Sequence, residues 1–172
     1  MGKSLETRTA KKVKGKVTIG SGNLWFDKED VKNSSWLFQT KATAKDKYSL
    51  KLVDINKLIT NAKKTNRKWA FVVEFNSDDS QQRTCYIGTS YEILDEELGE
   101  LFEYKKDVII NSIKTDKKQI TLSKDEMNDN WLAHEYIAYI FEKQKLTLCF
   151  LGEIDFYKIV LGEEKGKYGC HT

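Results

Sequence analysis

The sequence predicts an α/β fold, in which a single domain forms a central mixed β-sheet flanked by helices. The chain of 172 residues is long enough for one domain with a sizeable buried core. Between residues 36 and 75, a strand pattern, a helix pattern and a second strand pattern follow one another, which is the order of a β-α-β unit. The run WAFVVEF at 69–75 is almost continuously apolar, which is typical of a strand buried on both faces of a mixed or parallel sheet.

The expected elements of the first half are short apolar runs separated by polar turns. Residues 36–43 begin apolar and then alternate, which predicts the central strand. Asp54 is expected to cap a helix, because apolar residues recur after it at helical spacing as far as Ala62. The other elements expected here are a helix over residues 3–14 and strands over 17–19, 24–26, 69–75 and 84–87.

The second half has a more acidic character. Residues 91–102 have the spacing of an acidic amphipathic helix, and Ser123 and Glu126 form the S-x-x-E pattern of a capping box. The other elements expected here are strands over 108–111, 119–122 and 146–151, a helix over 131–143, and a closing strand or helix over 155–161. We expect residues 1–103 to form a core, and residues 104–172 to form an extension that packs on it and offers a surface for dimerisation or for a partner.

The composition excludes several classes of protein. No apolar run approaches the length that spans a bilayer, and the first residues lack the apolar region of a signal peptide, so we expect a cytoplasmic protein without a membrane partner. The three cysteines, Cys85, Cys149 and Cys170, have no C-x-x-C spacing, which argues against a disulfide framework and a structural zinc site. With only two histidines, catalysis by a Cys-His or Ser-His pair is poorly supported.

The net charge of +3 hides an uneven distribution of charge along the chain. Residues 1–68 hold 17 Lys and Arg against 6 Asp and Glu, a net charge of +11, whereas the remainder holds 12 against 20, a net charge of −8. A basic half of this kind suits a nucleic-acid phosphate backbone. Lysine far outnumbers arginine, and because lysine acts as a point charge, recognition of backbone and shape is favoured over the reading of bases.

The segment between residues 20 and 50 carries the candidate chemistry. A Gly-Ser-Gly turn is followed by an acidic cluster that includes Asp30, then by a polar bend, and then by the strand with Gln39 and Lys41. Residues two apart in a strand point to the same face, so Gln39 and Lys41 project together. If the chain doubles back at the bend, Asp30 lies beside them, and the three groups can hold a divalent cation and a water against a phosphodiester.

This ordered set resembles the PD-(D/E)xK nuclease superfamily, and within it the Holliday-junction-resolvase-like enzymes of archaea and phages. The resemblance covers roughly residues 4–75. The matching pieces are Glu6, the basic run 11–14, the Gly20-Ser21-Gly22 turn, Asp30, Gln39, Thr40, Lys41, Thr43 and Tyr48. The resemblance implies a restriction-endonuclease-like core and a homodimer that cuts branched DNA with Mg²⁺, for which Mn²⁺ substitutes. For a phage-encoded protein it implies the cytoplasm of the host.

The resemblance also implies a role for each matched residue. Asp30 would be the principal metal ligand, joined by Gln39 and by the main-chain oxygen of Thr40. Lys41 would orient or activate the attacking water, and Glu6 would reach a metal-bound water. The residues expected to contact DNA are Lys11, Lys12, Lys14, Ser21, Lys45 and Lys47.

Gln39 stands where the family has a glutamate, and it offers a neutral oxygen without a charge. Three outcomes are open: the amide oxygen of Gln39 binds the metal, a carboxylate from Glu74 or Glu29 replaces the lost charge, or the site is inactive. The leading functional hypothesis is a metal-dependent endonuclease for four-way or other branched DNA junctions. The alternatives are a non-catalytic DNA-binding or regulatory module and a restriction- or repair-type nuclease for duplex DNA.

Overall fold

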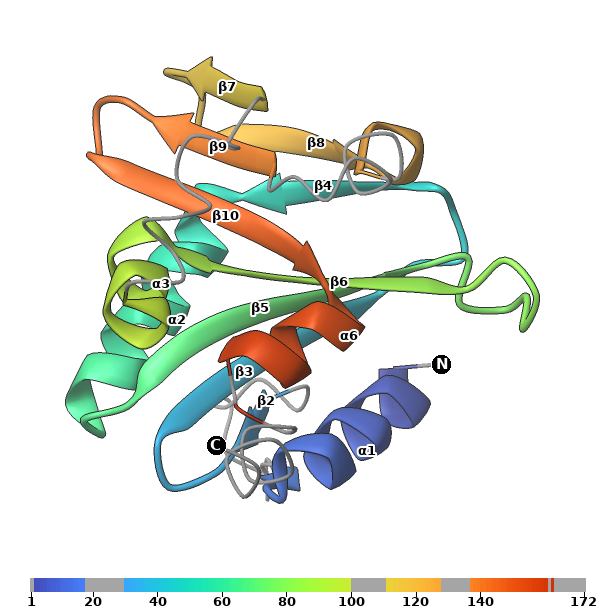
Figure 1. The fold of residues 1–172 in the computed structure, drawn as a ribbon. Helices are drawn as coiled ribbons and strands as arrows, with labels where there is room; N and C mark the ends of the chain where they lie inside the picture. The colour runs from blue at the N-terminus through green and yellow to red at the C-terminus, as the bar shows by residue number, and fades with distance from the viewer. Residues whose placement is uncertain (1, 18–29, 100–110, 128–136, 161, 163–172) are drawn as a thin grey trace. The chain divides into compact units, whose positions relative to one another are not determined.

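The chain has an α/β fold with a mixed β-sheet of eight strands and flanking helices, as the sequence predicts (Figure 1). This computed structural model describes residues 2–17, 30–99, 111–127, 137–160 and 162. The chain divides into two compact units. The first unit contains residues 1–85 and 117–126, and the second contains residues 86–116 and 127–172.

The first unit contains one helix before its sheet and one helix between two of its strands. Its elements are α1 (Gly2–Val13), β1 (Lys16–Val17), β2 (Asp30–Lys32), β3 (Trp36–Ala42), β4 (Lys47–Lys51), α2 (Leu52–Lys64), β5 (Lys68–Phe75) and β8 (Gln119–Ser123). In the part of the eight-stranded sheet that belongs to this unit, the strand order is β1-β2-β3-β5. β2 is antiparallel to β1 and β3, whereas β3 and β5 are parallel and are joined through β4 and α2. The expected β-α-β unit is therefore confirmed.

Apolar side chains bury both faces of the central strands of this unit. Phe38 on β3 and Phe71 on β5 are fully buried, and Ile55 on α2 is buried as well. The helix α2 begins at Leu52 with Lys51 at its N-cap position, so the prediction of a cap at Asp54 is wrong. The chain enters α2 directly from β4, so the helix starts three residues earlier than it would with Asp54 as its N-cap.

β4 and β8 form a separate two-stranded antiparallel ribbon, here called the β4–β8 ribbon (Figure 1). Its strands are far apart in the sequence, since β8 returns to the first unit after the chain has entered the second. Leu50 on β4 and Leu122 on β8 are fully buried, so one face of the ribbon belongs to the core of the first unit.

The second unit contains an antiparallel group of strands with one parallel strand at its edge. Its elements are the larger part of β6 (Thr84–Ser90), α3 (Tyr91–Leu98), β7 (Asn111–Thr115), β9 (Ile137–Phe141), β10 (Leu146–Gly152), the short helix α6 (Glu153–Asp155) and the π-helical turn η2 (Phe156–Val160). The strand order is β6-β10-β9-β7, with β7 parallel to β9. Gly88 allows the close approach of β10, because a Cβ atom there would lie 2.7 Å from the ring of Phe150.

Two of the predicted helices differ from the structure. Residues 137–141, expected to be helical within 131–143, form β9, and residues 131–136 lie outside the described chain. Four of its five residues are buried and it pairs with strands on both sides, so strand pairing outweighs the helical spacing of its apolar residues. The helix expected over 91–102 ends at Leu98, where Gly99 takes a φ of +52°.

The closing segment is helical, in the short α6 followed by η2. Phe156 and Tyr157 in η2 are buried, so this segment packs into the second unit.

Among the residues that the structure describes, no helix has the length and apolar character needed to cross a membrane.

Candidate functional site

The bend between β2 and β3 brings the predicted site positions into register. Asn33 stabilises the bend, because its Oδ1 accepts hydrogen bonds from the backbone N–H groups of Ser35 (2.9 Å) and Trp36 (2.7 Å). The chain then doubles back as an antiparallel pair in which Asp30 is directly opposite Gln39. The structure thus places two of the predicted site residues at the same level of neighbouring strands.

The strand β3 presents Gln39 and Lys41 on one face. Gln39 is 6% exposed and Thr40 is 1% exposed, whereas Lys41 is half-buried. By the alternation of a strand, Thr40 points to the opposite face from its two neighbours. The Oε1 atom of Gln39 accepts no hydrogen bond within the described part of the chain, although Gln39 has other contacts. An amide with a buried oxygen therefore lies directly opposite Asp30 on the neighbouring strand.

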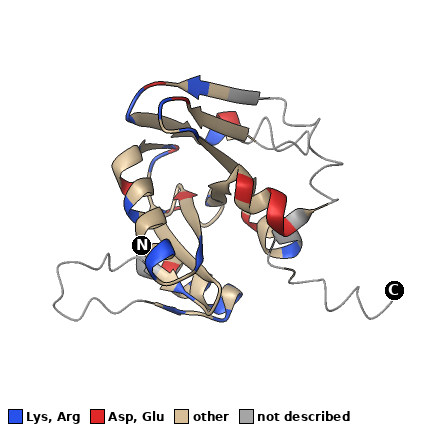
Figure 2. Ribbon diagram, turned by 90° about the vertical axis from the view of Figure 1, so that its left-hand side faces the viewer, with Lys and Arg blue, Asp and Glu red and all other residues tan. Residues whose placement is uncertain are grey.

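The helix α1 packs against β3 and carries the remaining predicted acid. Glu6 is 8% exposed, with Leu5 and Thr9 also buried on this side of the helix. The predicted DNA contacts at its end, Lys11 and Lys12, are exposed. Figure 2 colours the basic residues of the chain blue, and those in the last turn of α1 are Lys11 and Lys12. One helix therefore offers a buried carboxylate on one side and exposed ammonium groups on the other.

Glu74 on β5 forms an ion pair away from the predicted site residues. Its carboxylate is 1% exposed and forms an ion pair with the guanidinium of Arg8 on α1. In the parallel register Glu74 is level with Ala42, and paired residues of neighbouring strands share a face. Glu74 therefore lies on the opposite face from Gln39 and Lys41. This arrangement disfavours Glu74 as the replacement for the missing carboxylate.

The loop that follows β3 is held by hydrogen bonds to β5 and to the chain after β8. The N–H of Thr43 donates to the carbonyl of Glu74 (2.9 Å), and the N–H of Asn76 donates to the carbonyl of Lys45 (3.0 Å). The N–H of Lys124 donates to the carbonyl of Asp46 (2.9 Å). The loop is thus tied to its own unit through Thr43, Lys45 and Asp46.

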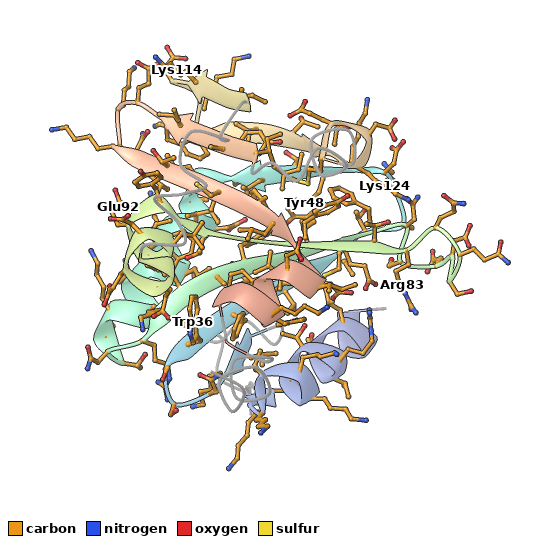
Figure 3. All side chains as sticks on the ribbon, viewed as in Figure 1. Trp36, Tyr48, Arg83, Glu92, Lys114 and Lys124 are labelled. Carbon is orange, nitrogen blue, oxygen red and sulfur yellow. The ribbon has the colours of Figure 1, made fainter. Side chains whose placement is uncertain are left out.

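Sequence reasoning missed both Arg8 and Lys124. Lys124, labelled in Figure 3, is 8% exposed, and its Nζ donates to Oδ1 of Asn76 (2.9 Å) and to the carbonyl of Gln82. A buried lysine in a chain of 26 lysines has no distinguishing sequence signal. Arg8 is one of three arginines, and this scarcity was the signal that could have pointed to a specific partner.

The remaining predicted residues divide between the surface and the part of the chain outside the described residues. Lys14 is exposed just after α1, with a φ of +53°, and Lys45 and Lys47 are exposed after β3. Ser21 and Glu29, together with the rest of the segment 18–29, lie outside the described residues.

The oxygen donors near β3 match the preference of Mg²⁺ in kind. Asp30 supplies a carboxylate by residue type, and Gln39 supplies an amide oxygen, which are hard ligands for this cation. Among the described residues no group of three or more His, Cys, Asp or Glu side chains is placed to hold a metal ion. The donors that the sequence predicts for a site here are the carboxylate of Asp30 and the neutral oxygens of Gln39 and Thr40.

Comparisons with models of protein families, with curated proteins and with solved structures give no match to this chain.

Proposed function

We propose that this protein is a metal-dependent, structure-specific DNA endonuclease with a restriction-endonuclease-like core, acting as a homodimer on four-way or other branched DNA junctions. The observation that carries the proposal is the register of β2 and β3, in which Asp30 is opposite Gln39 and Lys41 follows two residues later. The order of elements agrees with the resemblance, since a helix with Glu6 precedes the strand of Asp30 and the strand of Gln39 and Lys41.

The proposed chemistry divides the work among these residues. A bound Mg²⁺ would neutralise charge on the phosphate and make a water ligand easier to deprotonate. Asp30, the oxygen of Gln39 and the main-chain oxygen of Thr40 would hold the cation. Lys41 would orient the water and stabilise the negative charge that develops on the phosphate. Glu6 is left out of this chemistry, because Arg8 on the same helix pairs with Glu74, on the face opposite Gln39 and Lys41.

The second candidate is a DNA-binding or regulatory module without catalysis. The observation that favours it is the ion pair of Glu74 with Arg8, on the opposite face from Gln39. The nearest carboxylate on β5 is therefore not placed to restore the charge that the glutamine lacks. A site with one charge fewer binds a hard divalent cation less tightly.

The first experiment separates binding from cleavage. The purified protein would be incubated with a synthetic four-way junction, a flap and a linear duplex, with and without Mg²⁺ or Mn²⁺. The proposal expects junction cleavage only when a metal is present. Metal-independent junction binding without any cleavage would instead support the second candidate, and cleavage of linear duplex alone would exclude junction specificity.

Variants of Gln39 test its part in metal binding. If the amide oxygen is a ligand, Gln39→Glu supplies an anionic ligand and lowers the Mg²⁺ concentration for half-maximal cleavage, whereas Gln39→Ala raises it or abolishes cleavage. An inert wild type with an active Gln39→Glu variant would identify a binding module with a disabled site. Equal Mg²⁺ dependence in all three proteins would place Gln39 away from the metal.

A further inference from the structure

The β4–β8 ribbon has a regular pairing that sorts its residues onto two faces (Figure 1). One set of cross-strand pairs joins Tyr48 with Leu122 and Leu50 with Ile120. Directly opposite residues of an antiparallel pair share a face, so these four side chains form the inner face. The other set of pairs forms the outer face: Lys47 with Ser123, Ser49 with Thr121, and Lys51 with Gln119.

The inner face anchors the ribbon on the first unit. Leu50 and Leu122 are fully buried, and Ile120 is 9% exposed. The ring of Tyr48, labelled in Figure 3, lies 6.0 Å from the ring of Phe71 on β5, measured between centroids. Since the inner face is fixed by packing, the outer face has a defined orientation within this unit.

The outer face contains cations and neutral hydrogen-bonding groups but no carboxylate. Lys47 and Lys51 are exposed on β4. Gln119 and Thr121 are exposed on β8, and Ser49 is exposed between the two lysines. The six residues of this face therefore include two ammonium groups and no negative charge. The nearest carboxylate along β4 is that of Asp46, one residue before the strand.

These groups suit a phosphodiester backbone. Ammonium groups attract phosphates as point charges, and hydroxyl and amide groups donate hydrogen bonds to phosphate oxygens. Lys47 and Lys51 are four residues apart in a strand, which is about 13 Å. One strand of a DNA duplex presents about four phosphates over that length. The two lysines can therefore reach different phosphates of the same strand.

The ribbon is connected to the proposed site by a short and well-held loop. β3 ends at Ala42 and β4 begins at Lys47, and the loop between them is bonded to β5 and to Lys124. We infer that the outer face of the β4–β8 ribbon is a second nucleic-acid contact, which binds the phosphate backbone of a DNA arm extending from the site strand. This inference rests on the proposed function, and it assigns β8, from the second half of the sequence, to the DNA surface.

The test measures DNA binding by the full chain as a function of salt concentration, without divalent metal. In the variant Lys47→Ser/Lys51→Ser, the slope of log affinity against log salt for a duplex and for a four-way junction should fall in magnitude by about two, close to 0.9 for each lost phosphate contact. A second variant, Thr121→Glu, should weaken binding without removing a lysine. The matched control is Lys57→Ser/Lys63→Ser, which removes two exposed lysines from α2 in the same unit.

The outcomes separate this inference from the proposed function. Normal binding by the wild type with an unchanged slope in the ribbon variant would overturn the inference and leave the proposed function standing. An equal loss of slope in the control variant would also overturn it, because the effect would then be one of total charge. Absence of salt-dependent binding to any DNA by the wild type would remove both the inference and the proposed function. All the substituted side chains are exposed, so folding is expected to be unaffected.

Discussion

Lys41 is the residue whose loss should separate cleavage from binding. It is one of many cations in the first unit, but it shares a strand face with Gln39 and follows the position opposite Asp30. Lys41→Ala is expected to abolish metal-dependent junction cleavage while junction affinity changes by no more than a few-fold. The measurement is single-turnover cleavage alongside a binding titration. Lys57→Ala, on the exposed side of α2, is the control, and a Lys41→Ala protein that cuts at the wild-type rate would remove Lys41 from the chemistry.

Cys149 in the second unit makes the free energy of unfolding depend on pH in the alkaline range. Burial, and then the negative charge of Glu92, raise the pKa of its thiol from 9.0 to about 12. The unfolded chain releases this proton near pH 9, whereas the native chain retains it. The stabilising contribution is therefore complete below about pH 9 and is lost as the pH rises towards 12.

The effect can be isolated with the variant Cys149→Ala. The difference in unfolding free energy between wild type and variant, measured by urea unfolding from pH 8 to 10.5, should narrow by about 1.4 kcal/mol per pH unit above pH 9. The neighbouring substitution Leu148→Ala, which removes no titratable group, should show a constant difference. A constant difference for Cys149→Ala as well would show that its thiol ionises equally in both states.

At the scale of single residues, the sequence could predict the register of two strands but not the partner of each side chain. The polar bend and the alternation of β3 were enough to place Asp30 opposite Gln39. The ion pair of Arg8 with Glu74 joins residues that are far apart in the chain, and no local pattern encodes such a contact. The register could therefore be predicted where neighbouring strands are adjacent in sequence, whereas a contact that depends on tertiary packing could not.

At the scale of elements, the ion pair between α1 and β5 fixes the helix on the sheet. Glu74 is 1% exposed, whereas the side chain of Arg8 is 37% exposed. Arg8→Met leaves a buried carboxylate without its guanidinium, which should cost about 2–3 kcal/mol because the pair is only partly screened by solvent. Adding Glu74→Gln to Arg8→Met should recover more than half of this loss. The double-mutant cycle would be measured by chemical unfolding.

Lys11→Met provides the control for this cycle. It changes the same helix at an exposed position, and its effect on stability should be within about 0.5 kcal/mol. Simple additivity of Arg8→Met and Glu74→Gln would show that the pair does not hold α1 in place.

The elements that the sequence predicted best are those with one dominant pattern. β5, with its continuous apolar run, and the β-α-β order are confirmed. β9 was expected to be helical, because a buried apolar segment with partners on both sides carries no strict alternation to separate strand from helix. β4 was not predicted as a strand, and its partner β8 lies in the other half of the sequence.

At the scale of the whole molecule, residues 117–126 belong with the first unit although they lie between the two parts of the second unit in the chain. Hydrogen exchange of the backbone amides should therefore group residues 119–123 with residues 47–51. Leu122→Ala, which removes a fully buried side chain, should accelerate exchange in both strands of the ribbon more than in residues 137–141. Exchange of 119–123 that follows 137–141 instead would contradict this division of the chain.

The discontinuous first unit also has a consequence for the order of events during synthesis. A ribosome releases β3, α2 and β5 early, and these can pair while translation continues at about 5–20 residues per second. β4 cannot pair with β8 until Gln119 and the residues after it have left the ribosome. Until then, Tyr48 and Leu50 are not covered by β8. A nascent chain that stalls before this point exposes an unpaired strand edge beside an apolar face, which is the feature that chaperones bind and that drives aggregation.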